Sequence, residues 1–377
     1  MCPGDTSAGV ALVKSTGTAA CLLGKTWGYD DAGVWVAEGC SGEFQLGEIA
    51  AAPAGAPAPP AAKPPYVPVE TWGEFDPGKG FLIGRSALGE LDISAYALVR
   101  YVNQMPGEQT FKDHLGNTRT VDGRNDIWPH RVMVFLKGWV GDPRLIYAIT
   151  LWTVLDTNQN AIFGNLGYQF SRKFSVYAGL NGNPGTRSLQ GSHPFWLGND
   201  RVMADEFFRP FFGSGVWAQG EPVSGVWYNV MLSDTSSILG VKSSQLDRVY
   251  TTGASMWWMP TTKEFGPRGA YGDWEQHQQV ATRFGFSSTW SPEQRFTNTS
   301  GGTDNTTLRL ADSVNVFDTG ALASGVTVNQ VDYKVLSFDA GVKYRGFFLQ
   351  TEIYNRWLDH FEADGRLPVS SIHDQGF

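Results

Sequence analysis

The residues best suited to chemistry in this sequence are the charged side chains of the stretch 184–210. It holds three arginines and three carboxylates: Arg187, Arg201, Arg209, Asp200, Asp205 and Glu206. A guanidinium group is planar and can bind two oxygen atoms of an anion at once. If this long connection folds inward between strands, its arginines lie where charge decides which solutes pass. The three arginines are therefore candidate constriction residues.

A second set of charged residues lies in segments that we expect to be strands. They are Arg100, Arg283, Lys343 and Arg356, opposed by Asp339 and Glu352. We expect these side chains on the enclosed face of a sheet, and two interpretations remain open for each of them. The charges can set the ion preference of a pore, or they can form ion pairs that brace loops against the inside of the sheet.

Catalysis has little support in the sequence. The six histidines are scattered, and neither an HExxH pair nor a GxSxG nucleophile turn is present. We therefore predict that the protein is not an enzyme and needs no cofactor and no metal. The formal net charge of -8 gives no indication of a nucleic-acid partner.

The charged residues must be positioned by strands, and the stretch from Leu336 to Arg356 is the clearest case. Apolar and polar residues alternate through it, with an interruption at Arg345-Gly346 that is short enough for a tight hairpin turn. Period two gives each strand one apolar and one polar face. A soluble sandwich turns the apolar face to a core, whereas a membrane barrel turns it to lipid and its polar face to a lumen.

The connections favour the barrel. We expect about twelve strands after residue 72, and short turns between them tend to alternate with long loops, as in outer-membrane barrels. No apolar run is long enough for a transmembrane helix. Aromatic residues gather near the expected strand ends, where an interfacial girdle would lie: Trp139, Trp217, Trp257, Trp258, Trp290, Tyr344 and Trp357. The predicted fold class is all-β, with an antiparallel transmembrane β-barrel after a small β-rich domain.

Three parts of the chain differ in composition. Residues 1–48 contain short strand patterns and all three cysteines (Cys2, Cys21, Cys40) and predict a small disulfide-type β domain. Cys21 and Cys40 are a candidate disulfide, and three reduced thiols are the alternative. Residues 49–71 form a Pro/Ala-rich linker, and residues 72–377 form the barrel. No signal peptide is recognisable at Met1.

Two resemblances refine these expectations. The segments Trp27–Asp30, Gly33–Val36 and Gly39-Cys40 resemble a family of small secreted bacterial domains of unassigned function. The segments 135–145, 180–188, 204–210 and 337–346 are similar to bacterial porins of the phosphate-selective O/P type. That resemblance implies a barrel of about 16 strands that assembles as a homotrimer in the outer membrane of a Gram-negative bacterium.

The resemblance also implies a function and a missing part. We expect a channel for passive diffusion of small hydrophilic solutes, including inorganic anions such as phosphate, with membrane lipid as its surroundings. Because Ser371–Gly376 lacks a strand pattern, we expect a fragment of a longer porin, cut at both ends and without its C-terminal strands. The alternative is a non-channel outer-membrane or surface β-protein that binds glycan through aromatic loops.

Overall fold

The computed structural model divides the chain into two compact units, Met1–Pro65 and Tyr66–Phe377. It describes residues 6, 9–17, 19–30, 32–46, 71, 73, 75–76, 78–104, 109–154, 159–191, 195–198, 201–234, 236, 251–266, 271–295 and 308–377. The predicted linker lies outside the described residues except for its last position, Thr71, and so do Cys2 and Asp200. Among the described residues, no helix has the length and apolar character needed to cross a membrane.

The N-terminal unit consists of two small antiparallel pairs. Strand β1 (Val10–Ser15) pairs with β4 (Gly42–Leu46), and β2 (Trp27–Asp30) pairs with β3 (Gly33–Val36). The core is built around Trp27, whose ring lies 4.9 Å from that of Phe44. Gly28 is required there because a Cβ atom would lie 2.5 Å from the Trp35 ring. A core this small gains considerable stability from a crosslink.

The structure contains the disulfide between Cys21 and Cys40, which closes a sequence separation of 19 residues. A crosslink of that length is worth about 3 kcal/mol because it restricts the unfolded chain. We therefore expect the double change Cys21→Ser and Cys40→Ser to speed amide hydrogen exchange throughout β1–β4 of the full chain. Exchange in β17 and β18 serves as the internal control. Unchanged protection of β1–β4 would show that the crosslink is dispensable.

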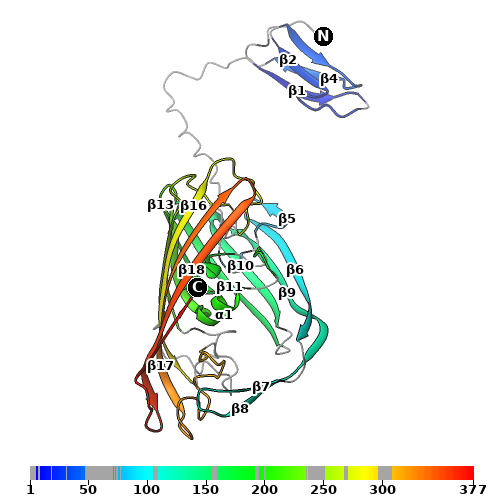
Figure 1. The fold of residues 1–377 in the computed structure, drawn as a ribbon. Helices are drawn as coiled ribbons and strands as arrows, with labels where there is room; N and C mark the ends of the chain where they lie inside the picture. The colour runs from blue at the N-terminus through cyan, green and yellow to red at the C-terminus, as the bar shows by residue number, and fades with distance from the viewer. Residues whose placement is uncertain are drawn as a thin grey trace. The chain divides into compact units, whose positions relative to one another are not determined.

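The second unit is dominated by one antiparallel sheet of 13 strands (Figure 1). Its strands are β5 (Phe81–Ser86), β6 (Gly89–Gln104), β9 (Arg124–Val140), β10 (Asp142–Val154), β11 (Gln159–Ser171), β12 (Phe174–Gly182), β13 (Phe212–Val223), β14 (Val226–Ser233), β15 (Thr251–Trp258), β16 (Ala281–Gln294), β17 (Val328–Tyr344), β18 (Phe347–Ala363) and β19 (Ser371–Gly376). Neighbours in the sheet follow chain order, except that β6 pairs directly with β9. The short strands β7 (Gln109–Lys112) and β8 (Thr118–Val121) form a separate hairpin between them.

The all-β antiparallel class predicted from the alternation is confirmed, with one strand more in this sheet than the estimate of about twelve. The sheet curls around an interior, as Figure 1 shows, but the described residues do not close it. Its edge strands β5 and β19 each pair with one neighbour, β6 and β18. The described sheet is therefore a curled, open one.

The prediction that Ser371–Gly376 forms no strand was wrong. These residues are β19, paired with β18 from Tyr354↔Gly376 to Asp359↔Ser371. The Arg356 guanidinium donates to Asp374, with Nη2 2.7 Å from Oδ2, and the rings of Trp357 and His373 stack. The strand is held by its partner's backbone and side chains, so its own apolar pattern can be weak.

The two faces of the sheet differ in the way that the alternation predicts. In β17, Phe338 on the outer face is 48% exposed, whereas Lys343 on the inner face is 0% exposed. The β17–β18 hairpin carries polar Ser337, Asp339 and Glu352 on the inner, buried row. Exposed apolar side chains lie outside and buried polar ones inside, which is the reverse of a water-soluble sheet with one covered face.

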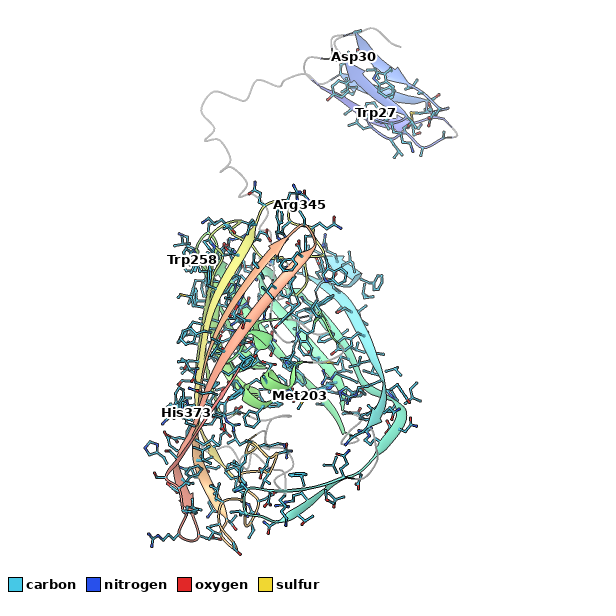
Figure 2. The ribbon with its side chains drawn as sticks, in the orientation of Figure 1. Trp27, Asp30, Met203, Trp258, Arg345 and His373 are labelled. Carbon is cyan, nitrogen blue, oxygen red and sulfur yellow. A yellow bond between two sulfur atoms is a disulfide. The ribbon has the colours of Figure 1, made fainter. Side chains whose placement is uncertain are left out.

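The residues predicted to form an aromatic girdle do not all lie on the outer face of the sheet. Trp258, Trp290 and Tyr344 are exposed on the outer face, and Figure 2 shows Trp258 pointing away from the interior. Trp217 and Trp257 are instead buried on the inner face, together with half-buried Trp139. Position near a strand end does not decide the face, because a side chain's direction follows the period-two alternation.

The connection between β12 and β13 enters the interior. It contains the 3-10 helix η1 (Arg187–Gln190) and the helix α1 (Met203–Phe208). In Figure 1, α1 lies within the curve of the sheet, and Figure 2 places Met203 there. Residues 182–191 are all buried. This connection reaches across to β16, β17 and β18, and it therefore positions most of the charged residues considered below.

Candidate functional site

Arg187 is the centre of the interior charge network. Its side chain is 0% exposed, and its Nε lies 2.5 Å from Oε1 of Gln350 and 3.8 Å from Oδ1 of Asp339. Its backbone N–H donates to Oε1 of Glu352 at 2.8 Å. The guanidinium also lies 4.6 Å from the centre of the Tyr271 ring. One residue of the β12–β13 connection is thus fixed against the inner faces of β17 and β18.

Arg283 on β16 joins the same network from the neighbouring strand. Its Nε donates to Oδ1 of Asp339 at 2.8 Å, and its Nη2 donates to Gln190 of η1. Gln190 in turn donates to Ser287 Oγ at 2.8 Å. Asp339 therefore lies between two guanidinium groups. Gly285 makes this possible, because a Cβ atom there would overlap the Asp339 carboxylate.

Lys343 lies further along the same inner row of β17. Its Nζ is 3.8 Å from Oε2 of Glu275 and 4.8 Å from the centre of the Phe265 ring. Both partners come from the connection between β15 and β16. Lys343 is thus a buried cation held by a carboxylate and an aromatic face.

Four of the nine predicted site residues therefore meet in one network: Arg187, Arg283, Asp339 and Glu352. A fifth, Lys343, lies on the same inner row of β17 as Asp339. In this network, positive and negative side chains lie close together, and the neutral amide side chains of Gln190 and Gln350 bind the two arginines. A group of side chains of this kind can exchange hydrogen bonds with hydrated ions and neutral polar solutes.

Arg201 and Arg209 lie in the same connection but bind to nearby groups. Arg201 forms an ion pair with Asp205 at 3.2 Å and lies 4.0 Å from the centre of the Trp196 ring. Arg209 pairs with Glu206 at 2.9 Å and packs over Phe211. Each arginine is neutralised by a carboxylate of its own segment. Their geometry fits bracing of the connection better than contact with a passing ion.

Arg100 and Arg356 lie away from the network. Arg356 is buried beside Asp374 of β19 and donates to the backbone oxygens of Phe207 and Arg309. Arg100 lies on β6, with its Nη2 3.2 Å from Nδ1 of His130. Arg356 therefore links the segments that contain Phe207 and Arg309 to the sheet. Arg100 lies on β6, a strand that contributes none of the described residues of the Arg187 network.

Sequence reasoning missed the neutral members of the network, namely Gln190, Gln350, Tyr271 and Ser287. Gln350 falls in the polar row of the β18 pattern and was detectable there, but only charged residues were selected as candidates. Tyr271 lies in a long connection without periodicity, so nothing in the local sequence marks its contact with Arg187.

Two groups of side chains have the donor types of a metal site. Asp273, Glu275 and His277 form one, and the other comprises Asp332, Asp359 and His360; within each group the ligand-type atoms lie within 4.8 Å of one another. In the first, burial alone would raise the pKa of Asp273, yet hydrogen bonds from His277 and from the Gly346 backbone lower it. The carboxylate thus already has internal donors.

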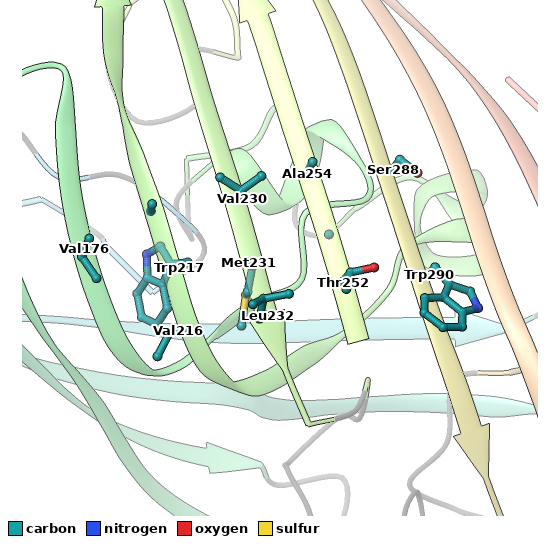
Figure 3. Close-up of a pocket in the computed structure, with 12 residues that line it drawn as sticks. Val176, Val216, Trp217, Val230, Met231, Leu232, Thr252, Ala254, Ser288 and Trp290 are labelled. Carbon is teal, nitrogen blue, oxygen red and sulfur yellow. The ribbon is translucent and has the colours of Figure 1, made fainter. Parts of the chain in front are cut away.

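The outer face also has a shallow depression, shown in Figure 3, over β12–β16. Small residues line it (Ala218, Ala254 and Ser288), flanked by Leu232 and Trp290. Its volume is about 490 Å³ and its lining is mostly apolar. This depression extends the exposed apolar surface of the sheet and contains none of the charged candidates.

Comparison with known proteins reaches only the N-terminal unit. The model of a family described as a protein of unknown function (DUF3011) matches residues 1–58. No curated protein and no solved structure matches the chain. The resemblance of residues 72–377 to phosphate-selective porins therefore remains a prediction, and the sheet must be interpreted from its own chemistry.

Proposed function

We propose that the protein is an outer-membrane channel for the passive diffusion of small hydrophilic solutes. The observation that carries this proposal is the polarity of the 13-stranded sheet. Its outer face exposes Phe338, Leu349 and Ile353, while its inner face buries Asp339 and Arg283. Exposed apolar surface of this extent is unfavourable in water and favourable in lipid.

The interior connection supports a selective rather than a wide channel. It places Arg187 across from β17 and β18, and mixed charges surround it. With Lys343 and its partner Glu275 included, three cations oppose three carboxylates. This balance favours weak selectivity over a strict filter, with inorganic anions such as phosphate among the solutes that pass. Assembly as a homotrimer in a Gram-negative outer membrane is part of the same proposal.

Planar-bilayer recording of the purified full-length chain tests the proposal. We expect discrete conductance steps and a reversal potential, in a salt gradient, that indicates weak ion selectivity. Replacing Arg187, Arg201 and Arg209 together by glutamate is expected to shift that potential toward cations, chiefly through Arg187. A silent bilayer with retained binding of glycan would instead support the non-channel alternative.

A further inference from the structure

A cavity of about 450 Å³ lies on the inner face of the sheet, away from the Arg187 network. Residues 71, 73, 75, 76, 78 and 79 line one side of it, and strands β6 and β9–β13 line the other. The cavity shares no lining residue with the Arg187–Asp339–Glu352 network. Its size is that of a pocket for a small organic ligand.

The charges around this cavity balance. Asp76 pairs with Lys137, and Glu90 pairs with Lys79 at 2.7 Å and with Arg85 at 2.5 Å. The lining itself holds three carboxylates, with Asp92 the third, and two cations, and Arg85 adds a third cation from just outside the lining. Both lining cations already pair with carboxylates, and the charges in and beside the lining balance, so the surroundings favour a neutral ligand.

Two buried acceptors in the lining lack donors. Oδ1 of Asp92 and Oε1 of Gln219 have no hydrogen-bond partner in the part of the chain that the structure describes. Asp92 is 3% exposed and Gln219 is 5% exposed. A buried polar atom without a partner costs about 1–3 kcal/mol, so the cavity favours a ligand that donates hydrogen bonds at two positions.

Aromatic rings supply the rest of the lining. Tyr177 and Trp217 stack with ring centres 5.3 Å apart and are buried. Trp139 and Tyr147 are half-buried and keep surface available, while their polar atoms already donate to the side chain and the backbone oxygen of Glu90. The flat apolar surface of these rings lies in the same cavity as two acceptor oxygens without hydrogen-bond donors. This combination suits a ligand whose ring carries hydroxyl groups.

We infer that this cavity binds a neutral polyhydroxylated solute of the size of a mono- or disaccharide. Its hydroxyl groups donate to Asp92 and Gln219, and the apolar side of its ring packs on Trp139 and Tyr147. The inference rests on the proposed function, because it makes this cavity a binding site for a solute that diffuses through the channel.

Calorimetric titration of the detergent-solubilised full chain with maltose tests the site without requiring conduction. We expect saturable binding, weakened about tenfold by Gln219→Leu, since one hydrogen bond to a buried acceptor is worth about that factor. Trp139→Leu, at a half-buried position, is expected to weaken binding similarly and serves if the first variant fails to fold. Gln294→Leu, the same chemical change outside the cavity, is expected to bind as the wild type does.

A change at Asp92 separates ligand classes. Asn retains an acceptor oxygen but removes the charge, so Asp92→Asn is expected to keep maltose binding within a few fold. Absent maltose binding, equal binding in all variants, or tighter binding of ethanolamine or inorganic phosphate would overturn the inference. Conductance without maltose binding refutes only the sugar site; maltose binding in a silent bilayer refutes only the channel.

Discussion

Replacing Arg187 by methionine is expected to lower the free energy of unfolding by about 3–5 kcal/mol, the usual cost of removing one partner of a buried ion pair. Methionine keeps much of the length of the side chain and the backbone N–H that donates to Glu352, but it removes the guanidinium beside Asp339. Gln350 also loses its donor. Chemical denaturation with intrinsic fluorescence as the signal measures the loss.

The same change is expected to release residues 183–191 from the inner face of β17 and β18. Amide hydrogen exchange there should rise, and single-channel conductance should increase because the connection no longer narrows the interior. Arg345→Met is the matched control, since Arg345 is exposed in the β17–β18 turn and such a surface change is usually worth less than about 0.5 kcal/mol. Unaltered stability and exchange in Arg187→Met would show that Arg187 does not hold the connection.

A double change distinguishes ion pairing from packing. If Arg187 acts by compensating Asp339, adding Asp339→Asn to Arg187→Met is expected to cost less stability than the sum of the two single changes, because the carboxylate that lost its guanidinium is gone. If the side chain acts mainly through its contact with Tyr271, the two changes will be additive. The coupling energy from the double-mutant cycle, measured by chemical denaturation of the wild type, both single variants and the double variant, distinguishes the two cases.

The enclosed rows of β17 and β18 were predictable because strand alternation is a local property. Asp339, Lys343, Glu352 and Arg356 follow it, and the structure buries all four. The residues that contact those rows from other parts of the chain were not predictable. The contact of Arg187 with Gln350 spans a sequence separation of 163 residues and depends on where the connection folds.

Strand β19 shows the other limit. Its residues have little apolar alternation, and its strand conformation comes from pairing with β18 and from Asp374 beside Arg356. Likewise, nothing in the composition next to the linker marks Phe75 as an interior residue. Both features arise from tertiary partners, which outweigh local propensity.

Replacing Phe75 by alanine is expected to release the segment Thr71–Gly80 from the interior. Phe75 is 6% exposed, with its ring 4.7 Å from that of Phe163, 4.8 Å from that of Phe212 and 6.5 Å from that of Trp152. Loss of a buried phenyl group costs about 3–5 kcal/mol. The remaining ion pair of Asp76 with Lys137 is partly accessible to solvent and is worth less than that.

Protease cleavage of the folded full chain within Thr71–Gly80 reports the release, with Phe81→Ala as the control because Phe81 is exposed. Phe75→Ala is expected to be cut there while the sheet stays intact, and Phe81→Ala is expected to resist as the wild type does. Because the same segment covers the cavity of Asp92 and Gln219, its release should also weaken maltose binding. Resistance to cleavage in Phe75→Ala would mean that the ion pairs of Asp76 and Lys79 hold the segment without the aromatic anchor.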